Sequence, residues 1–132
     1  MSAHAIGKAF LASHITASGG VFAGIAPPGT AAPYCTLQPY GGPGDVMGVA
    51  GTRLMSTVHW LVEFWGPATL YDAIESAYEA ADASIQQTRN VSVTGGIVLS
   101  CVRLLPRLAF LDVGAAQWVR LGGVYELRTQ PV

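Results

Sequence analysis

The segment STVHWLVEFW (Ser56–Trp65) constrains the fold of this chain more than any other. Side chains of a β-strand alternate between its two faces. One face of this segment is wholly apolar and consists of Val58, Trp60, Val62 and Phe64. The other face is mixed, with His59 and Glu63 beside the large apolar Trp65. The pattern therefore predicts a strand with one face in the core and one face open to solvent or to another chain.

An amphipathic helix of about five turns is predicted directly after this strand, because Gly66-Pro67 ends the strand and favours a helix start. Thr69 and Asp72 have the spacing of a helix cap. One arc of the helical wheel is apolar and consists of Leu70, Ile74, Ala77, Tyr78, Ala81 and Ile85. A separate arc is acidic, is expected to face solvent, and consists of Asp72, Glu75, Glu79 and Asp82.

Shorter patterns complete the predicted fold. They predict a helix over residues 3–14 and strands over residues 34–38, 90–93, 95–105 and 117–130. Residues 41–51 and 107–116 are expected to be loops, the second because Pro106 ends the strand before it. This order predicts an α+β fold, with a mainly antiparallel β-sheet and helices packed on one face, in a single domain over residues 1–132.

The composition favours a surface hidden by partners, with a monomer of unusually low surface charge as the alternative. Only 11% of the residues are charged, against about 25% in a typical soluble domain, and 51% are hydrophobic. No apolar run reaches the 18–20 residues of a membrane span, and the N-terminus lacks the pattern of a signal peptide. Six of the seven basic residues are Arg, which fits either protein interfaces or a GC-rich genome. The net charge of −1 argues against a dedicated nucleic-acid binder.

The sequence shows no catalytic, cofactor or metal signature. His59 and Glu63 share a strand face, but four residues of strand separate them by about 13 Å, so they are not expected to pair. The glycine loop at residues 41–51 lacks the Lys and the following helix of a phosphate-binding loop. Cys35 and Cys101 lie in apolar strands without metal spacing and are expected to be buried free thiols.

Taken in order, several segments resemble the tail terminator (tail completion) proteins of long-tailed phages and of related phage-derived particles. The segments are PPGTAAPYCTLQ, HWLVEFWG, PATLYDAIESAYEA, GGIVLSCVRLLP and WVRLGGVYELRTQ. The resemblance includes Pro33-Tyr34 before the first strand, Trp65-Gly66 at the end of the second, and residues 122–125 in the last.

The resemblance implies a structural virion protein at the head-proximal end of the tail, assembled in the host cytoplasm. Such a protein forms a hexameric ring on the tail tube, stops polymerisation of the tube protein and gives the head connector a docking surface. DNA passes through the ring without specific binding. The resemblance implies no enzyme activity, no cofactor and no membrane.

Several large side chains are candidate ring contacts at strand ends or loop tips, where a monomer gains little from them. They are Trp65, Phe110, Leu111 and Trp118. The alternative is that each covers an edge of its own core. Arg103, Arg107 and Arg120 are candidates for ion pairs between subunits, with solvated arginines as the alternative.

Two further segments receive roles in this interpretation. The glycine loop, with Gly44, Val46, Met47 and Gly48, is expected to be an assembly arm that becomes ordered in the ring or against the tube. The acidic arc is a hypothesis for the channel lining, where like charge would keep DNA from sticking.

Other functions stay open at this point. The chain fits another head-tail joining protein or a minor tail protein. A small α+β ligand-binding protein or enzyme is the alternative from a different class, and it would draw on His59, Glu63 and Tyr125.

Overall fold

The computed structural model describes residues 2–86 and 88–131. Its elements are α1 (Ala3–His14), β1 (Val21–Ala23), β2 (Tyr34–Pro39), β3 (Gly44–Met47), β4 (Arg53–Pro67), the 3-10 turn η1 (Ala68–Leu70), α2 (Tyr71–Ile85), β5 (Thr88–Val93), β6 (Gly96–Val113) and β7 (Ala116–Pro131).

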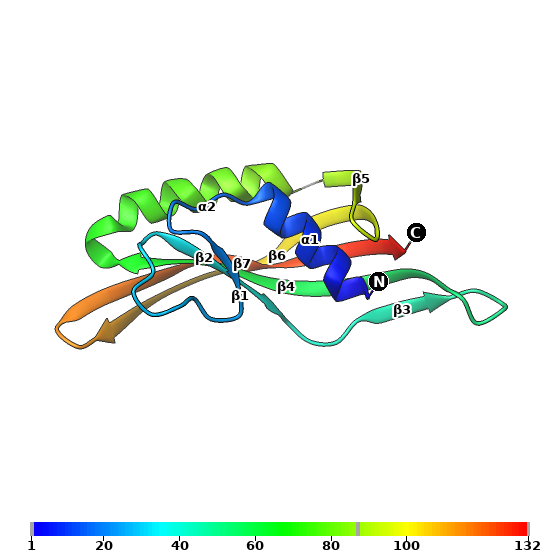
Figure 1. Ribbon diagram of the computed structural model, residues 1–132, viewed down its shortest axis with the longest axis horizontal. Helices are drawn as coiled ribbons and strands as arrows, with labels where there is room; N and C mark the ends of the chain where they lie inside the picture. Colours follow the sequence, from blue (N-terminus) through cyan, green and yellow to red (C-terminus); the bar gives the residue numbers. More distant parts are fainter. Residues whose placement is uncertain (1, 87, 132) are drawn as a thin grey trace.

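All strands belong to one sheet in the order β1-β2-β4-β7-β6-β5, with β3 paired to β4 alongside this path. Every pairing is antiparallel except the one between β1 and β2. Both helices lie on the same side of the sheet (Figure 1). One cluster of buried side chains joins α1 and α2 to β2, β4, β6 and β7. The predicted α+β class, with a mainly antiparallel sheet and helices on one face, is confirmed.

Strand β4 has the two faces that its sequence predicts. The apolar face forms the centre of the core, and Val58, Trp60, Val62 and Phe64 are each at most 3% exposed. The helices cover this face. Gly7 of α1 lies against Trp60, and Tyr78 of α2 packs edge-on against Phe64. The opposite face of the sheet, called the helix-free face below, carries the other side chains of β4.

Helix α2 confirms the predicted amphipathic pattern from Ile74 onward, with buried Ile74, Tyr78, Ala81 and Ile85. The buried position predicted for Leu70 is wrong, because Leu70 lies in η1 and is 38% exposed. The predicted cap is wrong, because Thr69 lies inside η1 and no side chain caps the first turn of α2. The solvent-facing position expected for Asp82 is also wrong. Its carboxylate accepts a hydrogen bond from Tyr125 of β7, so the buried face of this helix is wider than its apolar residues indicate.

The predicted loop over residues 107–116 is wrong, because β6 continues to Val113 and β7 begins at Ala116. Pro106 does not end the strand. Among the described residues, β5 pairs with β6 only as far as Cys101, so Pro106 has a ladder partner there on one side alone, the β7 residue Gly123. Proline is tolerated on such an edge, where its missing N–H breaks no ladder hydrogen bond.

The glycine loop at residues 41–51 contains a strand that the sequence pattern did not predict. β3 pairs with the start of β4, from Gly44 opposite Thr57 to Met47 opposite Arg53. We call β3, the turn at residues 48–52 and the paired start of β4 the arm. Figure 1 shows the arm at one end of the long axis and the tip of the β6–β7 hairpin at the other.

Candidate interaction surfaces

Two side-chain pairs link β4 to β7 on the helix-free face. His59 Nε2 lies 3.3 Å from Glu126 Oε2, and Arg120 Nε lies 3.5 Å from Glu63 Oε2. His59 and Glu63 therefore belong to separate pairs, as the strand spacing predicts. The sequence gives no sign of Glu126 as the partner of His59, because cross-strand neighbours depend on the register between strands 67 residues apart.

Glu63 is the most buried charged group on this face, at 4% exposed. Burial raises the pKa of its carboxyl above the ordinary value, while Arg120 and Arg107 act in the opposite direction. A raised pKa in the folded state means that folding favours the protonated form. This contribution to stability is present below the ordinary pKa and is lost as pH rises through the raised value.

The variant Glu63→Gln tests the direction of this pH dependence of stability. We expect its melting temperature to rise relative to that of the wild type as pH increases from below 4.5 to neutrality, because the neutral amide does not ionise. Thermal melts of both proteins across this range measure the difference, with Glu79→Gln on the exposed face of α2 as the control. Parallel curves for wild type and Glu63→Gln would show that burial of Glu63 has no such effect.

A partly buried polar cluster joins α2 to the sheet. The Tyr125 hydroxyl donates to Asp82 Oδ1 at 2.5 Å and lies 3.0 Å from the Tyr78 hydroxyl. Arg103 donates to the Tyr78 oxygen at 3.1 Å and lies 3.8 Å from Asp82. Burial and the hydrogen bonds to Asp82 and Tyr78 raise the pKa of Tyr125, so its hydroxyl remains a donor at neutral pH. The cluster holds the helix in place and leaves Tyr125 without access to a ligand.

Cys35 and Cys101 are buried free thiols, as the sequence predicts. Burial raises the pKa of each to about 12. Because the thiolate is the reactive form, neither side chain is available as a nucleophile at neutral pH.

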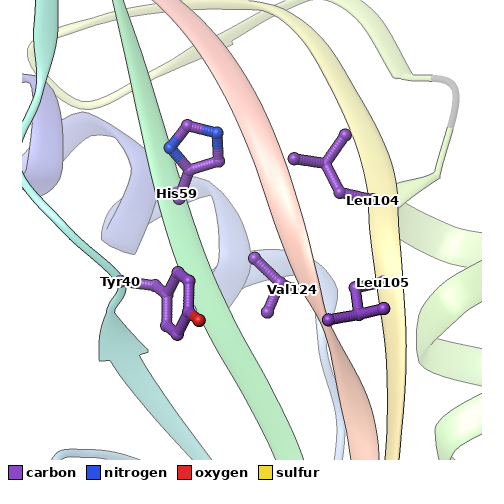
Figure 2. A pocket seen from close by; sticks show the side chains of 5 residues that line it. All are labelled: Tyr40, His59, Leu104, Leu105 and Val124. Carbon is purple, nitrogen blue, oxygen red and sulfur yellow. The ribbon is translucent and has the colours of Figure 1, made fainter.

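A shallow apolar hollow of about 380 Å³ lies on the helix-free face. Figure 2 shows its lining: Tyr40 and His59 on one side, Val124 of β7 at the centre, and Leu104 and Leu105 of β6 on the other side. Leu104 and Leu105 are each 53% exposed. His59 and the Tyr40 hydroxyl are the polar groups of this lining. A catalytic pocket for a small molecule usually has several convergent polar groups, so the hollow fits a protein contact better.

The predicted contact residues fall in two groups. Trp65 and Trp118 lie half-buried on the helix-free face, where Tyr34 stacks on Trp65 at 6.4 Å and the Arg120 guanidinium lies over the Trp65 ring. Leu111 pairs with Trp118 in the ladder of β6 and β7. Phe110 is on the helix side, 53% exposed, and stacks on Tyr71. Each of these residues contacts its own chain and also leaves apolar surface open.

The three predicted interface arginines also differ. Arg103 and Arg120 each have an acidic partner in their own chain, Asp82 and Glu63. Arg107 has no carboxylate within ion-pair distance in the described part of the chain, although it lies near enough to Glu63 to affect its pKa. Arg107 is therefore the best placed of the three to pair with another chain.

The arm exposes apolar side chains that its own chain does not cover. Val46, Met47, Val49 and Leu54 are each at least 48% exposed. Of the other predicted arm residues, Gly44 is the first residue of β3 and Gly48 directly follows its last residue, Met47. An exposed apolar hairpin of this kind indicates a contact with another protein.

The described residues contain no group of three or more His, Cys, Asp and Glu side chains arranged to hold a metal ion. Among the helices of residues 2–86 and 88–131, none is long and apolar enough to cross a membrane.

Comparison with known proteins shows the fold alone. No protein-family model and no curated protein matches the chain. Among solved structures, a chain in the virion of a native gene transfer agent (GTA) particle matches with a TM-score of 0.60. The match covers 83% of this chain and 78% of that chain, with 17% sequence identity.

Proposed function

We propose that this chain is a structural protein of a phage-like particle. The observation that carries the proposal is the fold shared with a chain of a gene transfer agent virion over 83% of this chain. The exposed apolar side chains of the arm and of the helix-free face also favour a protein that functions inside an assembly. The proposed role is structural and non-enzymatic, and it needs no cofactor.

Within such a particle we propose the role of a tail terminator, formed by the single domain of residues 1–132. The protein forms a hexameric ring at the head-proximal end of the tail. There it stops polymerisation of the tube protein and offers a docking surface to the head connector. The resemblance of segments along nearly the whole chain supports this role. The shared fold also fits a different joining component of the neck or a minor tail protein. An assembly experiment is therefore needed to distinguish these roles.

The proposed ring uses two different faces of each subunit, because a subunit in a closed ring contacts its two neighbours through different surfaces. Trp65, Leu111, Trp118 and Arg107 are proposed contacts on the helix-free face, and Phe110 is a proposed contact near the hairpin tip. Arg103 and Arg120 stay predicted contacts, although each already has a partner in its own chain. The arm is proposed to attach the ring to its neighbours or to the tube.

The hypothesis that an acidic helix face lines a DNA channel stays a prediction for Asp72, Glu75 and Glu79. Asp82 no longer belongs to this face, since its carboxylate is bound to Tyr125.

Native mass spectrometry over a concentration series, with and without purified tail tubes, tests the proposed function. We expect a hexamer, either free or only on tubes, because a weak contact between subunits gains strength on a template. Electron microscopy of the same mixture should show one ring at one end of each tube. A monomer or dimer that ignores the tubes would contradict the terminator role and direct attention to ligands of the hollow near Tyr40.

A further inference from the structure

The helix-free face is a mixed polar and apolar sheet surface that no helix of the described chain covers. Its exposed large side chains include Leu104 and Leu105, which border the hollow of Figure 2. Sheets of α+β proteins bury their apolar faces against another layer. On this face no helix of the described residues supplies such a layer, so the exposed leucines favour a contact with another chain.

The same face carries an excess of positive charge beside the apolar hollow. A second hollow of about 430 Å³ is lined by Leu105, Pro106, Arg107, Leu108, Ala109 and Arg120. Its two guanidinium groups are opposed by one carboxylate, the buried Glu63, which lies 3.5 Å from Arg120. Glu63 Oε2 accepts no hydrogen bond from the described residues. The positive charge of Arg107 is left for a carboxylate of a partner.

The outer face of α2 has the opposite charge and many small side chains. The helix contains no Lys or Arg. Its exposed small residues are Ala73, Ser76, Ala80, Ala83 and Ser84. The acidic side chains of this face are the exposed Asp72 and Glu79 and the half-buried Glu75, whose carboxylate accepts a hydrogen bond from Tyr71. A solvated helix face usually mixes long side chains of both charges, whereas small side chains let another element approach closely.

We propose that the outer face of α2 in one subunit packs on the helix-free face of the next, with Glu75 and Glu79 facing Arg107. Glu75 and Glu79 are one turn apart and share a side of the helix. The two surfaces are complementary in charge and lie on opposite sides of the molecule. Such a contact joins subunits head to tail and does not form a two-fold dimer. The proposal rests on the ring of the proposed function and names the faces that form it.

This contact would place Glu79 between subunits, whereas the channel hypothesis places it beside DNA. The variants Arg107→Glu and Glu79→Arg, alone and combined, separate the two. Arg89→Glu on the exposed part of β5 is the matched control. Ring formation is measured by native mass spectrometry with and without tubes, and thermal melts establish that each variant is folded.

We expect each single charge reversal to weaken ring formation about tenfold or more, because it places like charges opposite each other. The combined variant should recover most of the loss, and Arg89→Glu should behave like the wild type. Folded single variants that assemble normally would overturn the contact, as would a combined variant that shows no recovery. Glu79→Arg rings that form normally but impair DNA passage would favour the channel position. Absence of rings in the wild type would instead contradict the proposed function.

Discussion

We expect a protein that lacks residues 46–51 to fold and to lose its proposed attachment to tail tubes. The deleted residues form the end of the arm, and none belongs to the buried core. Within the described residues β3 pairs only with β4, so the pairing of β4 with β2 and β7 is kept. We therefore expect a change in unfolding free energy within about 1 kcal/mol, typical of surface changes.

The loss of attachment should be large. The deletion removes Val46, Met47 and Val49, and burying a side chain of this size contributes about 1.5–3 kcal/mol. Even partial burial of the three corresponds to an affinity loss of about a hundredfold or more. Co-sedimentation with tubes measures it, and thermal melts check the fold.

Ile25→Ser is the matched control, because Ile25 is 92% exposed and lies outside the arm. This variant should sediment with tubes as the wild type does. Substituting Ser for Val46, Met47 and Val49 keeps the length of the hairpin and should reproduce the deletion. Normal attachment by the deletion variant would refute the role of the arm.

The substitution Gly122→Ala should prevent folding. A Cβ at this position would lie 1.8 Å from the carbonyl oxygen of Val62 and 2.8 Å from Cα of Glu63. Both atoms belong to the backbone of β4, in the middle of the sheet, so neither can rotate away as the end of a side chain would. Separating β7 from β4 disturbs the ladder at the centre of the core. We expect the free energy of unfolding to fall by about 4 kcal/mol or more, which is exceptional for the addition of one methyl group.

Chemical denaturation and the yield of soluble protein measure this effect. Gly44→Ala is the control, because a Cβ there meets nothing within 4 Å and its backbone is in β3. The control should keep the stability of the wild type to within about 1 kcal/mol. A Gly122→Ala protein that is folded and equally stable would show that β4 and β7 move apart at little cost.

The sequence predicts the part of the fold in which one strand or helix decides burial by itself. The alternation of Val58, Trp60, Val62 and Phe64 places a strand on the core without knowledge of its neighbours. The spacing of Ile74, Tyr78 and Ile85 does the same for α2. These patterns suffice for the α+β class, because each depends only on local geometry.

Features that depend on pairing could not be predicted. Asp82 appears on the acidic side of the helical wheel, yet Tyr125 reaches it from a strand 43 residues away. Pro106 has the local properties of a strand end, but at the edge of the sheet it remains in β6. In the same way, the sequence identifies Arg107 as basic without showing that, unlike Arg103 and Arg120, it has no ion-pair partner among the described residues of its own chain.

The length of β4, β6 and β7 has a geometric consequence. These strands have 15, 18 and 16 residues, and at about 3.3 Å a residue the shortest alone extends about 50 Å. β4, β7 and β6 are hydrogen-bonded side by side along most of their length. The arm and the hairpin tip are therefore the two ends of one continuous part of the sheet. Their separation is therefore set by the length of the paired backbone. Partners that bind the two ends are held at that spacing.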